Sequence, residues 1–541
     1  MASTRFEFEN VILRFRDLST QDGETVSLHS NIAREHGFVW WGWWNKGGEQ
    51  VPSEEFAELR RKARQPGGLT LYLLDSGHSQ TYSSVCTDIH WEPGGEPIAS
   101  PDPEKTPSYY REKKVLAWFK LGPIESHHLE TSKYTYVRVD RFFTSQPSKY
   151  SAFYNKRIFS THELTEQNRT IWFMRKARSS DRQHEVSLLD GATLTPEHFP
   201  QRFIQSGSRN LLWVSDLHFD TGTDSHHGFS INPKTPARRT LGQAVHGALE
   251  KHLIRDLGGM LASGDITWKA AATEFEQALG FFKWMESSTN LTRFQIATCP
   301  GNHDLSYSTH REERDAPIDI TYPEARKEYA EFYAKLFGLT PNEHLSCGRR
   351  FLLGDSYSVD IVCLNSSILQ QRPGVFRGHG FVGEDQLRDA ANAFGWSSTK
   401  GADRRPFRIV MLHHHLVPVT YREQPDPAIS YSVTLDAEAL MRWAAECQVD
   451  LVLHGHMHEA SCVKISKPAA LSGKLKGWHD FHVIGMGSTG VSRDHQGSTG
   501  KNTFGILRFE DHSVIVTIYS VSPTDPSEEI WSVQIPLHRE R

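Results

Sequence analysis

The sequence predicts an α/β layered domain preceded by a separate, mainly β domain of mixed α+β type. The second half of the chain alternates strand-like and helix-like segments, which is typical of a buried sheet covered by helices. The first half has short aromatic and β-branched runs without that alternation. A chain of 541 residues is also too long for one compact core, so two domains, or three, are expected.

The first domain is predicted over residues 1–178, where strand-like runs lie between Gly, Pro and Ser clusters. Aromatic and β-branched residues of this kind are enriched in strands. The runs are LTLYLLD (69–75), KVLAWFKLG (114–122), YTYVRVDRFF (134–143) and TIWFMRK (170–176). A proline-rich stretch at 92–107 predicts a surface loop, and the polar, irregular residues 179–207 predict a linker.

The second domain is predicted over residues 208–525, with residues 526–541 as a C-terminal tail. Its strand-like runs include LLWVSD (211–216), GMLASGD (259–265), RFQIATC (293–299), YSVDIVCLNS (357–366), RIVML (408–412) and VDLVLH (449–454). Helix-like segments lie near 240–257, 273–287 and 434–447. Catalytic groups of such folds collect at the carboxyl ends of the strands, so polar residues there are candidates for a functional site.

Composition narrows the class of protein. The net charge of -5 gives no overall basic field, so a nucleic acid could be held only through a local patch. We expect neither a signal peptide nor a membrane span, since no basic segment precedes an apolar run at the start and no apolar stretch reaches roughly 18 residues. The six cysteines form no CxxC pair, which predicts reduced thiols in a cytoplasmic protein.

Clusters of Asp, Asn and His follow five of the apolar runs. They are Asp216 with His218, Gly264 with Asp265, Asn302 with His303 and Asp304, His413 with His414, and His454 with His456 and His458. Residues two apart in an extended segment point to the same face, so a pair such as Asp216 and His218 can present two ligands together. Imidazole and carboxylate groups suit Mn, Fe or Zn, and the lack of thiolates argues against a structural zinc site. One such residue is more often a satisfied turn residue than a ligand, but five clusters indicate a metal site.

These clusters resemble, in order, the motifs of calcineurin-like metallophosphoesterases. The matching segments are DLH (216–218), GD (264–265), GNHD (301–304), HH (413–414) and GHMH (455–458), and their arrangement resembles the cyclic-nucleotide phosphodiesterase branch. The resemblance implies a four-layer α/β/β/α sandwich and two divalent cations, with Mn expected before Fe or Zn. It also implies hydrolysis of a phosphoester by a hydroxide that bridges the two cations.

The resemblance implies a ligand set as well. One metal would be held by Asp216, His218, Asp265 and His458, and the second by Asp265, Asn302, His413 and His456. Many relatives have proline after the HH pair, where this chain has His415. His413 is preferred over His414 because it directly follows the apolar run, and His454 is expected to pack against ligands rather than to bind metal.

Two further residues are predicted to act in catalysis. His303 is not a metal ligand in the family pattern and would lie beside the phosphate, where it would stabilise charge and protonate the leaving oxygen. Asp304 would orient that imidazole, as carboxylates often do for histidine. The long segment between Asp304 and Leu352 is either a cap over the pocket or a peripheral helix with its loops.

Three functions remain open at this stage. The first is hydrolysis of a phosphodiester in a nucleotide or nucleic acid, and the second is hydrolysis of a phosphomonoester of a small metabolite or protein. The third is sensing by a phosphoesterase scaffold that has lost activity. A dead scaffold usually loses ligands, and all of them are present here, so an enzyme is favoured.

The amino-terminal domain contains a tryptophan cluster in GFVWWGWWNKGG (37–48). Its members are Trp40, Trp41, Trp43 and Trp44. Aromatic faces near Arg and Lys suit stacking on a base, and the pattern is similar to base-recognising domains of the PUA and EVE type. The alternative is a tryptophan-rich core. Trp43 and Trp44 cannot face the same side of a strand, so at least part of the cluster is expected to pack inside.

Overall fold

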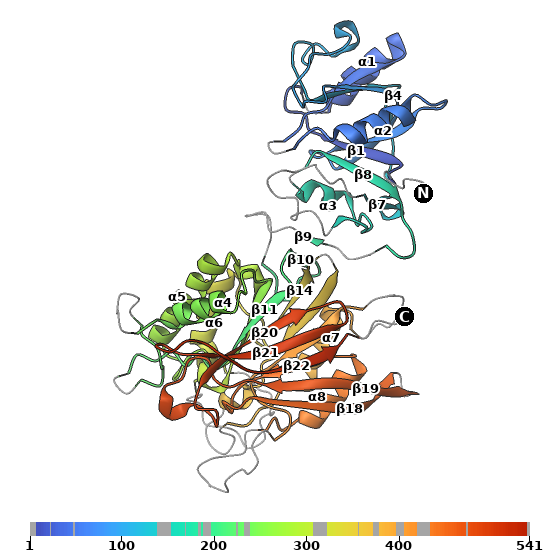
Figure 1. The fold of residues 1–541 in the computed structure, drawn as a ribbon. Coiled ribbons are helices and arrows are strands. Elements are labelled where there is room, and N and C mark those ends of the chain that lie inside the picture. Colours follow the sequence, from blue (N-terminus) through green and yellow to red (C-terminus); the bar gives the residue numbers. More distant parts are fainter. Residues whose placement is uncertain are drawn as a thin grey trace. The chain divides into compact units, whose positions relative to one another are not determined.

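Two units make up the chain in the computed structural model, Met1–Thr193 and Leu194–Arg541 (Figure 1). The structure describes residues 7–21, 23–46, 49–137, 153–167, 169–181, 186–187, 196–222, 225–231, 238–306, 322–354, 356–371, 378–396, 405–418, 433–471 and 474–537. The boundary between the units falls inside the predicted linker 179–207. The end of that linker is wrong, because Phe203–Ser206 form strand β10 of the second unit's sheet and pair in parallel with residues 351–353.

The first unit contains one mixed sheet with the strand order β2-β5-β4-β3-β1-β8-β7, and β6 pairs with β4. The strands of this sheet are β1 Asn10–Phe15, β2 Val39–Gly42, β3 Leu69–Asp75, β4 Gln80–Trp91, β5 Ala117–Leu121, β6 Glu125–Ser126, β7 Tyr134–Tyr136 and β8 Ile171–Lys176. The short strand β9 Val186–Ser187 does not belong to this sheet. Its helices are α1 Glu24–His36, α2 Ser53–Ala63 and α3 Thr161–Glu166. The four predicted strand-like runs become β3, β5, β7 and β8, although residues 138–143 of the third run lie outside the described residues.

Three of the four clustered tryptophans belong to the core of this unit. Trp40 and Trp41 lie in β2, and Trp43 directly follows it with only 1% of its surface exposed. The Trp43 indole nitrogen donates to the hydroxyl of Thr170 at 2.8 Å, which satisfies its one polar group. Trp44 differs, with 44% of its surface exposed. The core interpretation of the cluster therefore holds for all but Trp44.

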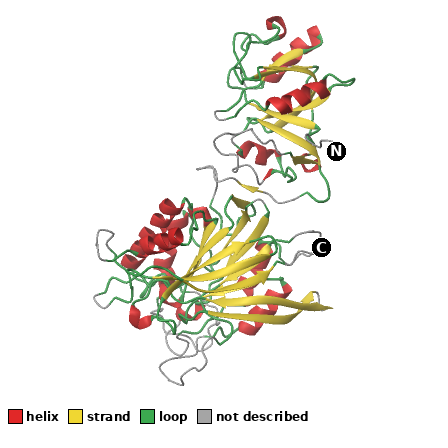
Figure 2. Ribbon diagram, in the orientation of Figure 1, coloured by secondary structure: helices red, strands yellow, loops and turns green. Residues whose placement is uncertain are grey.

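The second unit contains two sheets between layers of helices, which confirms the predicted four-layer α/β/β/α architecture (Figure 2). The first sheet has the order β13-β12-β11-β20-β21-β22, and the second contains β18-β19-β17-β16-β15-β14-β10. The remaining strands are β11 Asn210–Val214, β12 Gly259–Ser263, β13 Ile296–Cys299, β14 Cys347–Leu353, β15 Tyr357–Cys363, β16 Phe407–Met411, β17 Leu451–His454, β18 Ser461–Leu471, β19 Lys474–Gly485, β20 Asn502–Phe509, β21 Ser513–Val521 and β22 Glu529–Pro536. The helices are α4 Leu241–Lys251, α5 Ala272–Thr289, α6 Pro323–Phe337, α7 Glu384–Ala393 and α8 Ala437–Glu446.

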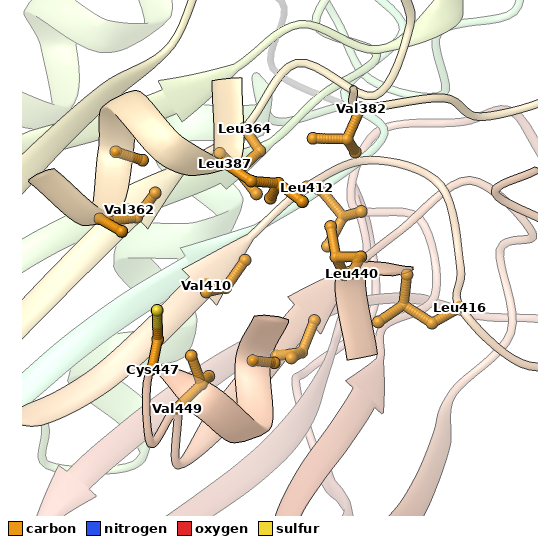
Figure 3. Close-up of a cluster of buried hydrophobic side chains, with 14 of the residues drawn as sticks. Val362, Leu364, Val382, Leu387, Val410, Leu412, Leu416, Leu440, Cys447 and Val449 are labelled. Carbon is orange, nitrogen blue, oxygen red and sulfur yellow. The ribbon is translucent and has the colours of Figure 1, made fainter. Parts of the chain in front are cut away.

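The helices cover the outer faces of the two sheets. Helices α4, α5 and α6 lie on the side of the first sheet, and α8 packs against β18 and β19 of the second (Figure 1). A cluster of buried aliphatic side chains joins the second sheet to α7 and α8 (Figure 3). It includes Val362 and Val410 from the strands, Leu387 from α7 and Leu440 from α8. Burying an aliphatic side chain of this kind stabilises the fold by about 1.5–3 kcal/mol, so the cluster holds the layers together.

The predicted tail is wrong over most of its length. Strand β22 pairs antiparallel with β21, from Ser513 opposite Pro536 to Tyr519 opposite Glu529. Trp531, Val533 and Ile535 alternate with polar residues as in a half-buried strand, although only Ile535 is fully buried at this sheet edge.

The segment between Asp304 and Leu352 is predicted to be either a cap over the pocket or a peripheral helix with its loops, and the structure supports the second alternative for α6. Helix α6 packs on α5 as a peripheral helix, with the Phe275 and Phe332 rings 5.1 Å apart. Residues 307–321 of the same segment lie outside the described residues. Among the described helices, none is both long enough and apolar enough to cross a membrane.

Candidate metal centre

The centre lies in the second unit, where the carboxyl ends of five strands converge. β11, β12 and β13 run parallel in one sheet, and β16 and β17 run parallel in the other. The predicted ligands occupy the loops that leave these strands, two to four residues after each strand ends. Both sheets therefore contribute side chains to the same edge of the sandwich.

The first group consists of Asp216, His218 and His458. Nε2 of His458 lies 3.3 Å from Nε2 of His218 and 3.4 Å from Oδ1 of Asp216. Asp216 and His218 are almost fully buried, and His458 is half-buried. Nδ1 of His458 contacts the backbone carbonyl of His495 at 2.7 Å, which turns Nε2 toward the group.

The second group consists of Asp265, His413 and His456, with Asn302 beside them. Nε2 of His413 lies 3.1 Å from Oδ2 of Asp265 and 3.1 Å from Oδ1 of Asn302. The same nitrogen lies 3.1 Å from Nδ1 of His456. The structure thus brings together four residues from β12, β13, β16 and β17.

Asp265 joins the two groups, because its Oδ2 also lies 3.6 Å from Nε2 of His218. Nitrogen and oxygen ligands about 2.0–2.2 Å from a cation stand roughly 3–3.5 Å from each other when they surround it. The donor atoms lie 3.1–3.9 Å apart, which is close to such separations, and their chemistry is the imidazole and carboxylate mixture that suits Mn, Fe or Zn. The residues present fit a pair of divalent cations that share Asp265.

The fourth motif offers three neighbouring histidines, and only His413 enters the second group. Its Nδ1 lies 2.9 Å from the carbonyl of Ser263, so its Nε2 faces Asp265. Nδ1 of His414 instead contacts the hydroxyl of Ser366 at 2.9 Å. His415 and His454 are buried outside both groups.

The backbone at the centre has an uncommon conformation. Asp216, His218, Asp265, His456 and His458 all have positive φ, between 44° and 73°. A non-glycine residue held in this left-handed region costs about 1–3 kcal/mol and persists only where the surroundings enforce it. Five of the predicted ligands share this conformation, which marks the centre as a functional site.

Two glycines allow the backbone to approach the carboxylates. A Cβ atom on Gly455 would lie 2.2 Å from Oδ2 of Asp216. A Cβ atom on Gly301 would lie 2.1 Å from Oδ1 of Asp265. Neither position has room for a side chain, so the glycines of the GNHD and GHMH motifs are required by close packing.

Burial and the nearby carboxylates have opposite effects on the pKa values of the histidines in the centre. Burial acts to lower the pKa of His413, but Asp265 and Asp216 raise this pKa to about 9. Burial holds the pKa values of His218 and His456 well below 6.5, so these two rings are neutral and available as ligands. A cation would take the place of the proton on His413, because metal ligation requires a neutral imidazole.

His303 lies beside the centre rather than in it. Its backbone N–H donates to Oδ1 of Asp265 at 2.8 Å, and its ring Nδ1 lies 2.7 Å from the carbonyl of Trp268. The carbonyl can only accept, so Nδ1 carries the proton. Nε2 is then the nitrogen that remains for a substrate.

The prediction that Asp304 orients His303 is wrong. The Asp304 carboxylate is fully buried and accepts from the backbone N–H groups of Ile266, Thr267 and Gly301 at 2.8–3.1 Å. Burial and the neighbouring Asp265 raise the pKa of Asp304 to about 7. Asp304 therefore fastens the loops that carry Asp265 and Asn302, and the Trp268 carbonyl takes the role that was predicted for it.

Sequence reasoning missed Trp268 and His226, which lie next to the centre. The His303 and Trp268 rings are stacked with centroids 4.2 Å apart, and the Trp268 and His226 rings with centroids 3.5 Å apart. Neither residue belongs to a motif. The contacts of His303 and His413 with backbone carbonyls also have no signal in the sequence, since every residue has a carbonyl group.

Family comparison agrees with this geometry. Residues 209–460 match the family described as calcineurin-like phosphoesterase, and residues 11–185 match the family described as Pua-like. The second unit thus belongs to the calcineurin-like phosphoesterases, and it follows a Pua-like domain. The chain is accordingly a metal-dependent phosphoester hydrolase, of a family that uses two divalent cations.

Solved structures with a similar fold include a purple acid phosphatase from seeds of yellow lupin (Lupinus luteus). It is 11% identical, the match covers 86% of this chain and 69% of that one, and the TM-score is 0.37. Vacuolar protein sorting 29 from Cryptosporidium parvum is 10% identical over 61% of this chain and 100% of that one, with a TM-score of 0.26. With TM-scores this low, neither structure identifies a substrate of this chain. Comparison with curated proteins finds no match.

Proposed function

We propose that this chain hydrolyses a phosphodiester in a nucleotide or a nucleic acid, with two divalent cations, manganese first among them, as cofactors. The observation that carries the proposal is the convergence of seven side chains in two groups that share Asp265. The two cations, when bound, supply Lewis acidity and lower the pKa of a water molecule. Support for a diester comes from the motif spacing, which is similar to the cyclic-nucleotide phosphodiesterase branch.

The residues of the chain have separable tasks in this proposal. Asp216, His218, Asp265, Asn302, His413, His456 and His458 hold the cations. His303 keeps its Nδ1 proton on the Trp268 carbonyl, so in the protonated ring Nε2–H is free to donate. A proton given to the leaving oxygen there contributes about 10²–10⁴-fold to the rate of such reactions.

We assign recognition of a base to the first unit, through Trp44. This ring is 44% exposed, and the Lys113 ammonium lies 4.5 Å from its centroid. The Tyr110 ring, with its centroid 5.7 Å away, supports it from inside the unit. An exposed indole with a lysine ammonium over its ring suits a base that is attached to a phosphate, because the ammonium attracts the phosphate and the ring then stacks on the base.

The proposed reaction is tested with two artificial esters. After chelation and addition of Mn²⁺, the chain is expected to hydrolyse bis(4-nitrophenyl) phosphate faster than 4-nitrophenyl phosphate. Preference for the monoester would replace the proposal with a phosphomonoesterase acting on a metabolite or protein. Metal binding without hydrolysis of either ester, or of nucleotide diesters, would favour a sensing protein.

The proposed base recognition is tested with Trp44→Ala. Hydrolysis of bis(4-nitrophenyl) phosphate should be unchanged, while KM for a single-stranded oligonucleotide or a nucleotide diester should rise. Base stacking on an aromatic side chain stabilises binding by about 1–3 kcal/mol, so the expected rise is roughly 5- to 100-fold. Leu18→Ala is the matched control, because Leu18 is another exposed apolar residue of the same unit, with 72% of its surface exposed. Equal effects of both variants, or none, would refute the role of Trp44.

A further inference from the structure

Four aromatic rings form a continuous column that begins at His303. The centroids are 4.2 Å apart from His303 to Trp268, 3.5 Å from Trp268 to His226, and 3.5 Å from His226 to His495. The corresponding planes are tilted by only 19°, 8° and 23°. Trp268 has a ring against each face, so nothing can enter between the column's members.

The column stands next to the metal centre. The ring of His218 lies edge-on to it, with centroids 5.1 Å from His303, 5.5 Å from Trp268 and 6.0 Å from His226. The loop that contributes His495 also contributes the carbonyl that contacts His458. The aromatic column and the metal centre are thus held in place by the same loop.

Trp268 holds His303 in two ways at once. Its carbonyl accepts the Nδ1 proton at 2.7 Å, and its indole covers one face of the imidazole. The hydrogen bond fixes the direction in which Nε2 points, and the stacking fixes the plane of the ring. A hydrogen bond alone would leave the imidazole free to swing about the Nδ1–O axis.

His226 holds the indole from its other side. The His226 backbone N–H donates to Oδ2 of Asp220 at 2.8 Å, and its carbonyl accepts from Ser492 N–H at 2.6 Å. The first bond holds His226 within the loop after β11, the second ties that loop to the loop after β19, and the His495 ring closes the stack. The His226 ring is therefore held in place, and it limits the movement of the Trp268 indole and, through the indole, of the His303 ring.

We propose that His226 and Trp268 are positioning residues for His303, which set its Nε2 at the leaving oxygen of the substrate. This inference rests on the proposed function. A general acid works only within hydrogen-bond reach of its target, and a displacement of about 1 Å can cost about 10²-fold in rate. The demand for protonation grows as the leaving group becomes more basic, so the column should matter most for poor leaving groups.

The test uses His226→Ala and aryl phosphodiesters whose leaving phenols range from acidic to weakly acidic. We expect turnover of the ester with the poorest leaving group to fall by roughly 10- to 100-fold. The ester of 4-nitrophenol should be hydrolysed at close to the wild-type rate, and two metals per chain should be retained. The slope of log kcat against the phenol pKa should therefore become steeper.

His226→Phe restores a stacking ring without imidazole nitrogens, and it should return the slope to that of the wild type. His246→Ala is the matched control, since it removes a histidine that packs on another tryptophan of the unit, with the His246 and Trp284 centroids 5.6 Å apart. An unchanged slope in His226→Ala, an equal loss with all esters, or loss of metal would each overturn the inference. Inactivity of the metal-loaded wild type with every ester would instead refute the proposed function itself.

Discussion

The metal centre of the second unit and the tryptophan cluster of the first unit are the two most conspicuous features of the sequence, and the fold uses them in opposite ways. The metal-centre residues are spread over about 240 positions and converge at the ends of five strands. The tryptophans occupy four of five successive positions, yet three of the four are buried in the core. Trp44 alone faces solvent.

The difference shows what kind of pattern predicts a functional site. Parallel strands of a sheet bring their carboxyl ends to the same edge. Polar residues that recur at the ends of several separate strands are therefore expected to meet in one site. A local run of aromatic residues is equally compatible with packing, because large apolar side chains stabilise a small domain wherever they are buried. Four predictions test this contrast, and the one with the largest expected effect comes first.

Asp265→Asn should have the largest effect, with loss of both metals and activity below detection. The exchange removes the negative charge that both groups share, at 3.1 Å from His413 and 3.6 Å from His218. Metal content is measured by mass spectrometry and turnover with bis(4-nitrophenyl) phosphate. Asp480→Asn, which changes a partly exposed carboxylate on β19, serves as the control. Two bound metals with normal turnover would disprove the shared ligand.

His303→Ala should keep both metals and lose about 10²–10⁴-fold in turnover of a diester whose leaving group is weakly acidic. The imidazole contacts the Trp268 carbonyl through Nδ1 and lies outside both ligand groups, so its removal leaves the donor set intact. Metal stoichiometry and kcat are measured on the same preparation. Loss of metal would place His303 among the ligands and contradict the assignment.

Trp43→Ala should destabilise the first unit by about 3–5 kcal/mol, the usual cost of deleting a buried aromatic side chain. Trp44→Ala should change its stability by no more than about 0.5 kcal/mol, because most surface substitutions stay within that range. Amide hydrogen exchange of peptides from residues 49–137 reports on this unit alone. Similar losses of protection in both variants would mean that Trp44 is also part of the core.

Acidification should weaken the first unit through His29, whose side chain is buried. Burial lowers the pKa of His29 from 6.5 to about 4. The unfolded chain therefore takes up a proton on His29 below about pH 6.5, whereas the folded unit does not. The free energy of unfolding should fall between pH 6.5 and 4 by on the order of 3 kcal/mol from this residue. His29→Leu should flatten that part of the pH profile in the same exchange experiment, and an unchanged profile would contradict the shift.

Much of the fold could be predicted because the central strands of the second unit, such as β11 and β17, are buried on both faces. Runs such as residues 211–214 and 451–453 are continuous apolar segments and are conspicuous in the sequence. Strand β22 has no continuous apolar run, because it lies at the sheet edge, and its alternation of Trp531, Val533 and Ile535 with polar residues was overlooked. The role of Asp304 was predicted wrongly because its position next to His303 in the chain does not determine which groups hydrogen-bond to its carboxylate.

By itself, the sequence determined that this chain combines an α/β phosphoesterase domain with a mainly β domain, and which residue types form the metal centre. Those features depend on local periodicity and on motifs whose members lie close together in the chain. Tertiary structure decided that His413 rather than His414 enters the centre, that five ligands have positive φ, and that His226 stacks on Trp268. Such choices depend on backbone direction and on contacts between residues far apart in the chain, which only the packed sheets and loops bring together.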